Sequence, residues 1–445
     1  MKGPTMHRRL STVGLVAVLA LGATACNSSS PKAGPSASAS TSASPTAVNL
    51  TGVTLEVAAE WQKDEQKSFQ AVLTAFEQKT GAKIKYTSTG NDTATILGTR
   101  VAGGNPPDVA LIPQPGLIQQ FVDKSAAKPL PQSVQDIVKA NYAQTWQDLG
   151  TFNGSMYAVW FKAANKSTVW YRPETFTTAG VTEPKTWDEF VKTLGTLRDA
   201  GVTPLSVGGA DGWTLTDWFE NVYVRSAGAD MYDKLTKHEI PWTDPSVTQA
   251  LTLLADVWKV KSLLAPNALQ TTFPDSVTQV FGTKKAAVVY EGDFVAGVIS
   301  GSTKAKVGTD AKFFAFPNVG TSPASVIGGG DAAVMMKDSP GAVALMEFLA
   351  GPEAADIWVK LGGFTSPNKS VPAADYPDDT SRAIADLLVN AAVFKFDMSD
   401  LAPSQFGGTP GQGEWKDLQT FLGNPTAVTA TAAKLEADAK AAYKK

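Results

Sequence analysis

Short apolar segments alternate with amphipathic stretches in the first third of the chain. Residues 53–58 are mainly apolar and residues 109–112 entirely so, and residues 83–86 alternate polar with apolar side chains, so all three segments are predicted strands. Residues 63–79 place Phe69, Val72, Leu73 and Phe76 on one face at helical spacing, and Gly81 follows as a stop signal. This order of strands and helices predicts a doubly wound α/β sheet.

A second series with the same character begins near residue 160. Residues 169–171, 286–290 and 313–316 are predicted strands, and a helix is expected from residue 245. Thr186 and Glu189 have the spacing of a capping box at the start of another helix. No internal repeat at a fixed period is visible. Two α/β units of similar size predict two lobes, with a ligand expected between them.

The N-terminus has the features of an export signal. Basic residues precede an apolar run at residues 10–23, which is shorter than the about 20 residues that a membrane span needs. Cys26, the only cysteine, follows small residues as in a bacterial lipobox, although Ala23 stands where such motifs usually carry Leu. We expect a signal peptide at residues 1–25 and a lipid-anchored flexible linker at residues 26–48. An ordinary cleaved signal beside an unrelated cysteine is the alternative.

Composition restricts the chemistry that the chain can perform. The 445 residues include 39 basic and 42 acidic side chains, a net charge of −3 without a basic run, which disfavours nucleic acid as a partner. His238 is the only histidine beyond the signal segment, and we expect it to be structural. The GxSxG, GxxxxGK[ST] and HExxH motifs are absent from the sequence. We therefore expect that the protein is not an enzyme and uses neither a metal nor a cofactor. A calcium ion held by carboxylates stays open as an alternative.

Many segments along the mature chain agree in order with one protein family. They include residues 157–159, the segment Glu291-Gly292-Asp293-Phe294, and a glycine-rich strand that ends at Asp331. On these segments the chain resembles the solute-binding proteins of carbohydrate ABC importers. The segments 216–221, 238–242, 362–368 and 394–400 resemble its α-glucoside-binding branch.

The resemblance implies a two-lobed, periplasmic-binding-protein-like α/β fold with a hinge of three crossings. Each lobe would be a doubly wound sheet flanked by helices, and the crossings would lie near residues 158–163, 317–326 and 365–371. Lobe 1 would comprise residues 49–158 plus 318–368, and lobe 2 residues 163–317 plus 369–445. The protein would be a monomer, lipid-anchored to the outer face of the cytoplasmic membrane. It would bring its ligand to the membrane subunits of an ABC importer.

Sugar recognition needs hydrogen-bonding carboxylates and amides beside flat aromatic surfaces. By sequence position or by the family resemblance, the candidate ligand-binding residues are Glu60, Trp61, Gln62, Asp64, Gln114, Trp160, Lys162, Trp213, Asp217, Trp218, Glu291, Asp293, Phe294, Asp331 and Trp415. Core packing is the competing role for the tryptophans, and helix capping for Asp217.

The expected function is capture of a sugar, such as an α-glucoside, with closure of the hinge around it. An exported glycoside hydrolase that uses a carboxylate pair, an adhesion lipoprotein and a binder of a non-sugar solute stay open. Gly328, Gly330 and Ala333 nearly form a GxGxxG/A dinucleotide loop, but a strand is expected after them where that loop needs a helix.

Overall fold

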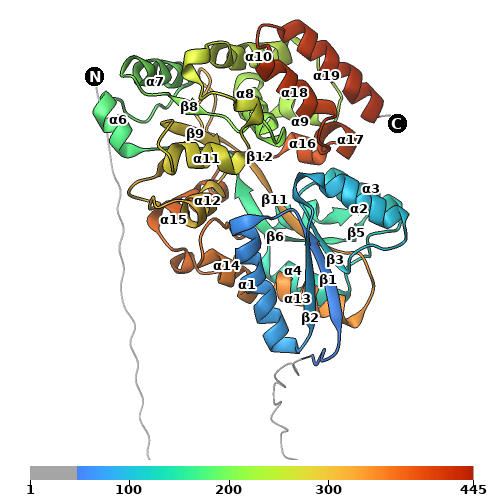
Figure 1. The fold of residues 1–445 in the computed structure, drawn as a ribbon. Helices are drawn as coiled ribbons and strands as arrows, with labels where there is room; N and C mark the ends of the chain where they lie inside the picture. Colours follow the sequence, from blue (N-terminus) through green and yellow to red (C-terminus); the bar gives the residue numbers. More distant parts are fainter. Residues whose placement is uncertain (1–47, 444–445) are drawn as a thin grey trace, which may run out of the picture. The chain divides into compact units, whose positions relative to one another are not determined.

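The computed structural model describes residues 48–443 (Figure 1). The predicted signal peptide, Cys26 and nearly all of the predicted linker lie outside these residues. Within the described part, no helix is long and apolar enough to cross a membrane.

The first sheet has a parallel part and an antiparallel part. The strands β1 (Thr54–Ala59), β2 (Lys83–Ser88) and β3 (Val109–Ile112) are parallel, with β1 in the middle. The long strand β11 (Ser325–Met335) pairs antiparallel with β3 and with β6 (Ala158–Asn165). The short strand β12 (Val393–Phe396) lies parallel to the first residues of β11. All three strands predicted in the first third of the chain are confirmed.

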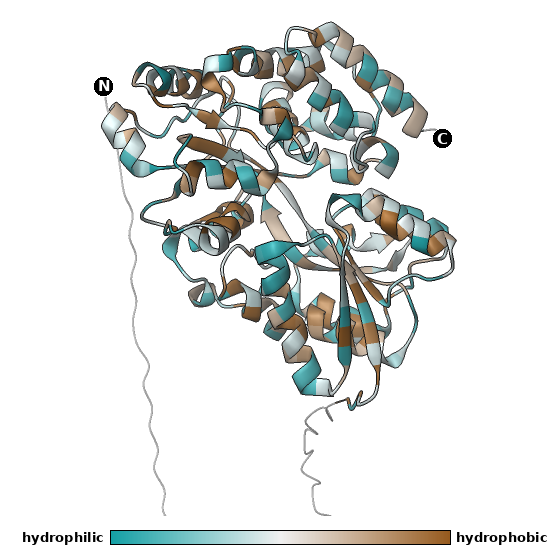
Figure 2. Cartoon of the chain, viewed as in Figure 1, coloured by the Kyte–Doolittle hydropathy of each residue, from teal (hydrophilic) through white to brown (hydrophobic). Residues whose placement is uncertain are grey.

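Helices cover both faces of this sheet. The first helix, α1 (Lys63–Thr80), buries Phe69, Val72, Leu73 and Phe76 as predicted and ends at Gly81, whose φ of 78° is left-handed. The remaining elements of this lobe are α2 (Thr93–Ala102), α3 (Pro115–Asp123), α4 (Gln132–Asn141), α5 (Gln144–Leu149), α13 (Pro340–Ala350), α14 (Pro352–Val359) and the hairpin of β4 (Thr151–Phe152) and β5 (Ser155–Met156). The apolar residues of β1 and β3 form brown bands between the helices (Figure 2).

The second sheet has the strand order β10-β7-β9-β8. These strands are β10 (Lys312–Ala315), β7 (Thr168–Tyr171), β9 (Val288–Glu291) and β8 (Leu205–Ser206). The helices of this lobe are α6 (Pro173–Ala179), α7 (Trp187–Asp199), α8 (Trp213–Ala227), α9 (Ala229–Thr236), α10 (Pro245–Trp258), α11 (Phe273–Phe281), α12 (Val295–Ser302), α15 (Asp379–Val389), α16 (Met398–Leu401), α17 (Ser404–Gly407), α18 (Gly413–Gly423) and α19 (Val428–Ala442). Both bonds of the predicted capping box between Thr186 and Glu189 are present.

The chain passes between the two sheets where the strands end. Because β6 continues to Asn165 and β7 begins at Thr168, the first passage is the pair Lys166 and Ser167, slightly later than expected. The second lies between β10 and β11 at residues 316–324, close to the expected position. Residues 393–396, which the prediction gave to lobe 2, form β12 in the first sheet, because their backbone pairs with residues 325–328. The two-lobed α/β architecture is confirmed.

Candidate ligand-binding site

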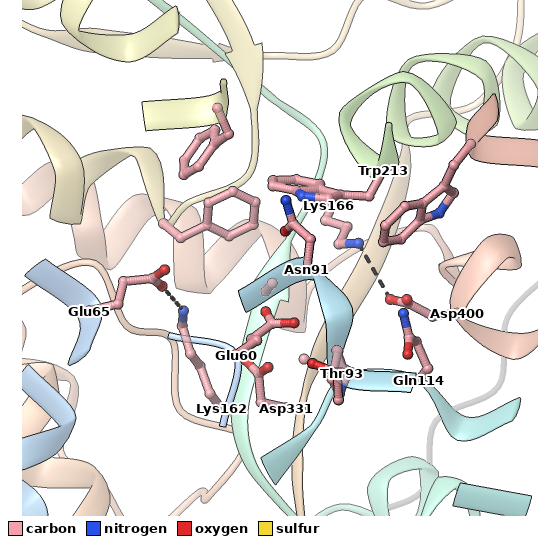
Figure 3. Close-up of a pocket in the computed structure, with 16 residues that line it drawn as sticks. Glu60, Glu65, Asn91, Thr93, Gln114, Lys162, Lys166, Trp213, Asp331 and Asp400 are labelled. Atoms are coloured by element: carbon pink, nitrogen blue, oxygen red, sulfur yellow. Dashed lines mark hydrogen bonds and ion pairs between the residues drawn. The ribbon is translucent and has the colours of Figure 1, made fainter. Parts of the chain in front are cut away.

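An inner compartment lies between the two sheets and is lined from both lobes (Figure 3). Most of its polar wall is buried, and aromatic rings face it from the second lobe. The lining residues are Glu60, Glu65, Asn91, Thr93, Pro113, Gln114, Lys162, Ala164, Lys166, Trp213, Phe273, Phe294, Gly330, Asp331, Asp400 and Trp415.

An outer compartment adjoins the inner one and shares Glu60, Glu65, Asn91, Trp213 and Phe273 with it. Its other lining residues are Trp61, Gln62, Lys63, Asp64, Gly90, Asp211, Thr272, Pro274 and Val298. Since they share one wall, the two compartments form a single cleft.

The parallel strands bring the first polar groups to the cleft. Glu60 follows β1 and Gln114 follows β3, and the carboxyl ends of parallel strands are the usual ligand edge of such sheets. Lys162 and Asp331 are paired across β6 and β11, next to an irregularity in the ladder. A Cβ at Gly330 would lie 2.3 Å from the Lys162 carbonyl oxygen, so only glycine lets these two backbones approach so closely. Because β11 continues through Ala332–Met335 as a strand, the dinucleotide-loop alternative is excluded.

Aromatic rings form the wall that faces these polar groups. The ring centroids of Trp213 and Phe294 are 5.8 Å apart, and that of Phe273 lies 5.4 Å from Trp213 and 5.1 Å from Phe294. Trp415 packs against Gly212, where a Cβ would come within 2.9 Å of the Trp415 Cβ. Tilted and edge-to-face contacts between Trp213, Phe273 and Phe294 hold these rings in fixed orientations, so they offer rigid apolar surfaces to a ligand.

The polar wall carries more acidic than basic groups. Lys162 Nζ donates to Glu65 Oε1 at 2.6 Å. Burial disfavours the charged ammonium of Lys162, but attraction to Glu65 and Asp331 outweighs it, and the net effect raises its pKa. Burial raises the pKa of Asp331 to about 6, against the opposing effect of Lys162. Burial, followed by repulsion from Asp331 and Glu65, raises the pKa of Glu60 well above its ordinary value.

Three buried polar atoms in the inner compartment have no hydrogen-bond partner among residues 48–443. They are Gln114 Oε1, Asp331 Oδ1 and Trp415 Nε1. A buried polar atom without a partner costs about 1–3 kcal/mol, so such atoms are rare unless a ligand or water completes them. Two acceptors and one donor are therefore available on the wall for a polyhydroxylated ligand.

Ten of the fifteen candidate residues line the cleft. Glu60, Gln114, Lys162, Trp213, Phe294, Asp331 and Trp415 lie on the inner wall, and Trp61, Gln62 and Asp64 on the outer wall. Trp61 is also a core residue, because only 2% of its surface is exposed and its ring lies 4.6 Å from that of Phe69.

The other five candidates do not reach the cleft. Trp160 packs against Phe396 at a centroid distance of 5.1 Å, and Trp218 against Tyr290 at 4.5 Å, so both indoles are core residues. Buried Asp293 is used internally, since it accepts from the Asn165 amide and from the Thr365 hydroxyl. Asp217 and Glu291 are also buried away from the cleft. Asp217 does not cap α8, since no side-chain cap bond is present there.

The sequence interpretation missed nine residues of the inner compartment, Glu65, Asn91, Thr93, Pro113, Ala164, Lys166, Phe273, Gly330 and Asp400, and six of the outer one, Lys63, Gly90, Asp211, Thr272, Pro274 and Val298. Asp400 closes the segment 394–400, which the family resemblance had already singled out, and Gly330 belongs to the glycine run beside Asp331. The others carry no motif. His238 lies outside both compartments, 3.1 Å from Glu436, in agreement with a structural role.

The pKa values of the buried carboxyl groups predict how stability depends on pH. Burial raises the pKa of Asp217 to about 8 and that of Asp331 to about 6, so the folded chain binds more protons than the unfolded chain above about pH 4. Their contribution to stability is lost as pH rises towards 8. Glu56 beside Arg100 and Asp397 beside Lys166 each have a pKa lowered to about 2, and their contribution is lost below about pH 4.

We therefore expect the ligand-free melting temperature to be highest near pH 4 and to fall as the pH rises from there towards 8. Circular dichroism at constant ionic strength would measure this. Asp217→Asn should make the decrease in melting temperature above pH 6 smaller. A melting temperature that rises from pH 6 to 8 would contradict the assignment.

The fold and the cleft between its lobes define a solute-binding protein. The model of the family of bacterial extracellular solute-binding proteins matches residues 60–356, and the chain belongs to this family. The family resemblance inferred from the sequence is thereby confirmed, and the extracellular description agrees with the predicted export.

Two relatives align along most of the chain. The alpha-glucosides-binding periplasmic protein AglE of Rhizobium meliloti is 34% identical over 403 residues, which cover 86% of each chain. The osmoprotective compounds-binding protein GgtB of Synechocystis is 32% identical over 374 residues, which cover 81% of this chain and 86% of GgtB.

Solved structures share the fold at low sequence identity. The bacterial solute receptor AcbH, described as having an exclusive preference for β-D-galactopyranose, superposes with a TM-score of 0.77 at 19% identity and covers 88% of this chain and 99% of its own. RafE in complex with raffinose gives a TM-score of 0.71 at 18% identity over 87% of this chain and 100% of its own.

Proposed function

We propose that this protein captures a neutral sugar outside the membrane and brings it to an ABC importer. The observation that carries the proposal is the cleft itself: aromatic rings on one wall face carboxylate and amide groups on the other. A sugar ring has two apolar faces and a rim of hydroxyl groups, so it needs both kinds of wall. The unpaired oxygens of Gln114 and Asp331 would accept from hydroxyl groups, and the Trp415 indole would donate to one.

The proposed ligand class is an α-glucoside, as in the name of AglE, the relative that is 34% identical. A small osmoprotective solute is the second candidate, because GgtB is similar over almost the same length. Aromatic walls also bind quaternary ammonium groups through cation–π contacts, so the cleft chemistry suits either class.

Binding should close the two lobes around the ligand. Residues 166–167, residues 316–324 and the segment that follows β12 pass between the sheets and would serve as hinges, and the ligand would contact both lobes at once. The closed form would then be presented to the importer's membrane subunits. We expect the ligand-binding part to be monomeric and to use its own side chains, with neither metal nor cofactor.

The experiment that tests the function is calorimetric titration of the mature protein. The panel should hold methyl α-glucoside, maltose, trehalose, sucrose, raffinose, galactose and glycine betaine. A ligand at about 100 times its Kd should stabilise the protein by about 2.7 kcal/mol, which thermal unfolding detects independently. Binding of glycine betaine alone would favour the second candidate, and binding of no sugar would contradict the proposal. Release of p-nitrophenol from p-nitrophenyl α-glucoside would instead indicate a hydrolase.

Lipid attachment at Cys26 is a separate part of the proposal. Since Cys26 is the only thiol in the chain, Cys26→Ala should release the protein into the culture medium with its ligand affinity unchanged. Fractionation followed by titration would measure both. A variant that stays with the membrane fraction would exclude this anchor, and Cys26→Ser, which also lacks the thiol, should be released in the same way.

A further inference from the structure

Lys166 occupies a special place in the backbone, because it is one of only two residues between β6 and β7. Its amide donates to the Ile327 carbonyl at 2.9 Å, which joins it to β11. Its own carbonyl accepts from the Tyr290 hydroxyl and from Asn221 Nδ2, both at 2.8 Å. Tyr290 is in β9 and Asn221 is in α8. The first passage between the lobes is therefore fixed to both lobes at this residue.

The side chain of Lys166 is the centre of a buried ionic cluster. Nζ lies 2.5 Å from Asp397 Oδ2, 3.3 Å from Asp217 Oδ1 and 3.4 Å from Asp400 Oδ2. Asp217 comes from α8, whereas Asp397 and Asp400 follow β12, where the chain leaves the first sheet again. A Cβ at Gly329 would lie 2.8 Å from Lys166 Cε, so β11 also packs on the stem. The ammonium group and stem of Lys166 thus contact α8, β11 and the residues after β12, which are far apart in sequence.

The cluster also reaches the ligand cleft. Lys166 and Asp400 both line the inner compartment, and Figure 3 shows the ion pair between them on its wall. Lys166 Nζ lies 6.0 Å from the ring centroid of Trp213, which is one turn before Asp217 in α8. A ligand on Trp213 or Asp400 would touch groups that Lys166 holds in place.

We propose that Lys166 is a positioning residue that links the ligand-contacting groups Trp213 and Asp400 to the passages between the lobes. The inference rests on the proposed sugar-binding function and adds to it a residue that sets lobe orientation.

The geometry explains how such a link would work. One ammonium group faces three carboxyl groups, and Asp400, the one on the cleft wall, is the most distant of them. Burial, and then repulsion from Asp397, raise the pKa of Asp400 well above its ordinary value, and the attraction of Lys166 offsets this only in part. A ligand hydroxyl that donates to Asp400 would change its attraction for Lys166. Because Asp397 and Asp217 bind the same ammonium group, a change in the attraction between Asp400 and Lys166 would also change how Lys166 is held in the first passage between the lobes.

The test compares Lys166→Met with Lys395→Met in the full mature protein. Lys395 is a matched control, because it also bonds one carboxylate at 2.5 Å, that of Asp233, but lies in β12 outside the cleft. Maltose and methyl α-glucoside are the probes. We expect Lys166→Met to weaken binding by about tenfold or more, as for loss of a charged hydrogen-bond network, and Lys395→Met to bind as the parent does. Lys166→Arg, which keeps the charge, should recover most of the affinity.

Small-angle scattering of the ligand-free variants distinguishes a positioning role of Lys166 from a role in packing only. Because it needs no ligand, it also tests that role independently of the proposed sugar binding. We expect a wider distribution of interatomic distances for Lys166→Met than for the parent or Lys395→Met. If Lys166→Met does not fold, the charge-balanced pair Lys166→Met with Asp397→Asn replaces it. Unchanged scattering together with unchanged affinity would overturn the role of Lys166. If the parent binds no sugar, the proposed function fails, and the ligand-free scattering still decides the positioning role.

Discussion

Replacing Trp213 by alanine should weaken sugar binding roughly thirtyfold. The indole is half-buried, lines both compartments and is held by Phe273 and Phe294 at centroid distances of 5.4 Å and 5.8 Å. An aromatic contact contributes roughly 0.5–1.5 kcal/mol beyond its buried area, and the lost area brings the expected change to about 2 kcal/mol. Trp213→Phe should be much milder, because a flat ring remains. Calorimetric titration with the sugar that the panel identifies measures both.

The matched control for Trp213 is Trp146, another half-buried tryptophan that lies outside the cleft. Trp146 packs against Trp160 at a centroid distance of 5.6 Å, so Trp146→Ala should lower the melting temperature and keep the affinity. Trp213→Ala should show the opposite pattern. If Trp213→Ala binds normally and melts far lower, its indole serves packing and the aromatic wall is not a ligand surface.

The predicted helices and strands could be read from the sequence because their signals lie within short stretches of the chain. The buried face of α1 follows helical spacing, and the capping box at Thr186 needs only residues three apart. The place of β12 could not be predicted in this way. Residues 393–396 pair with residues 325–328 across a separation of nearly seventy positions, and nothing in a four-residue apolar run specifies its partner strand.

Glu60 could be placed from the sequence because it follows a parallel strand, and the carboxyl ends of such strands form the usual ligand edge of the sheet. Gln114 was placed by the family resemblance, and it lines the same cleft after β3. The tryptophans were harder to assign to the cleft or to the core, because their large apolar rings suit core packing and sugar contacts equally. Trp213 enters the cleft at the first residue of α8, whereas Trp218 in the same helix points into the core. Lys166 carries no motif, and its partners are brought together only by folding.

Replacing Gly116 by alanine should hold the lobes apart and weaken sugar binding by at least about tenfold. Gly116 is in α3 of the first lobe, and a Cβ there would lie 2.0 Å from the Ala402 carbonyl oxygen and 3.1 Å from that of Leu401. Ala402 belongs to the core of the second lobe. Carbon and oxygen repel strongly at 2.0 Å, so the two backbones must separate by about 1 Å or more. Since a sugar in the cleft would contact both lobes, this separation should cost affinity.

The same change should leave each lobe folded, because Gly116 is not among the glycines with a positive φ and alanine is a good helix former. We expect a larger ligand-free radius of gyration in small-angle scattering and a melting temperature within a few degrees of the parent. Gly98→Ala is the matched control, since Gly98 lies in α2 of the same lobe and a Cβ there would meet nothing within 4 Å. Parent-like affinity and scattering for Gly116→Ala would show that α3 and residue 402 do not approach each other in the ligand-bound form.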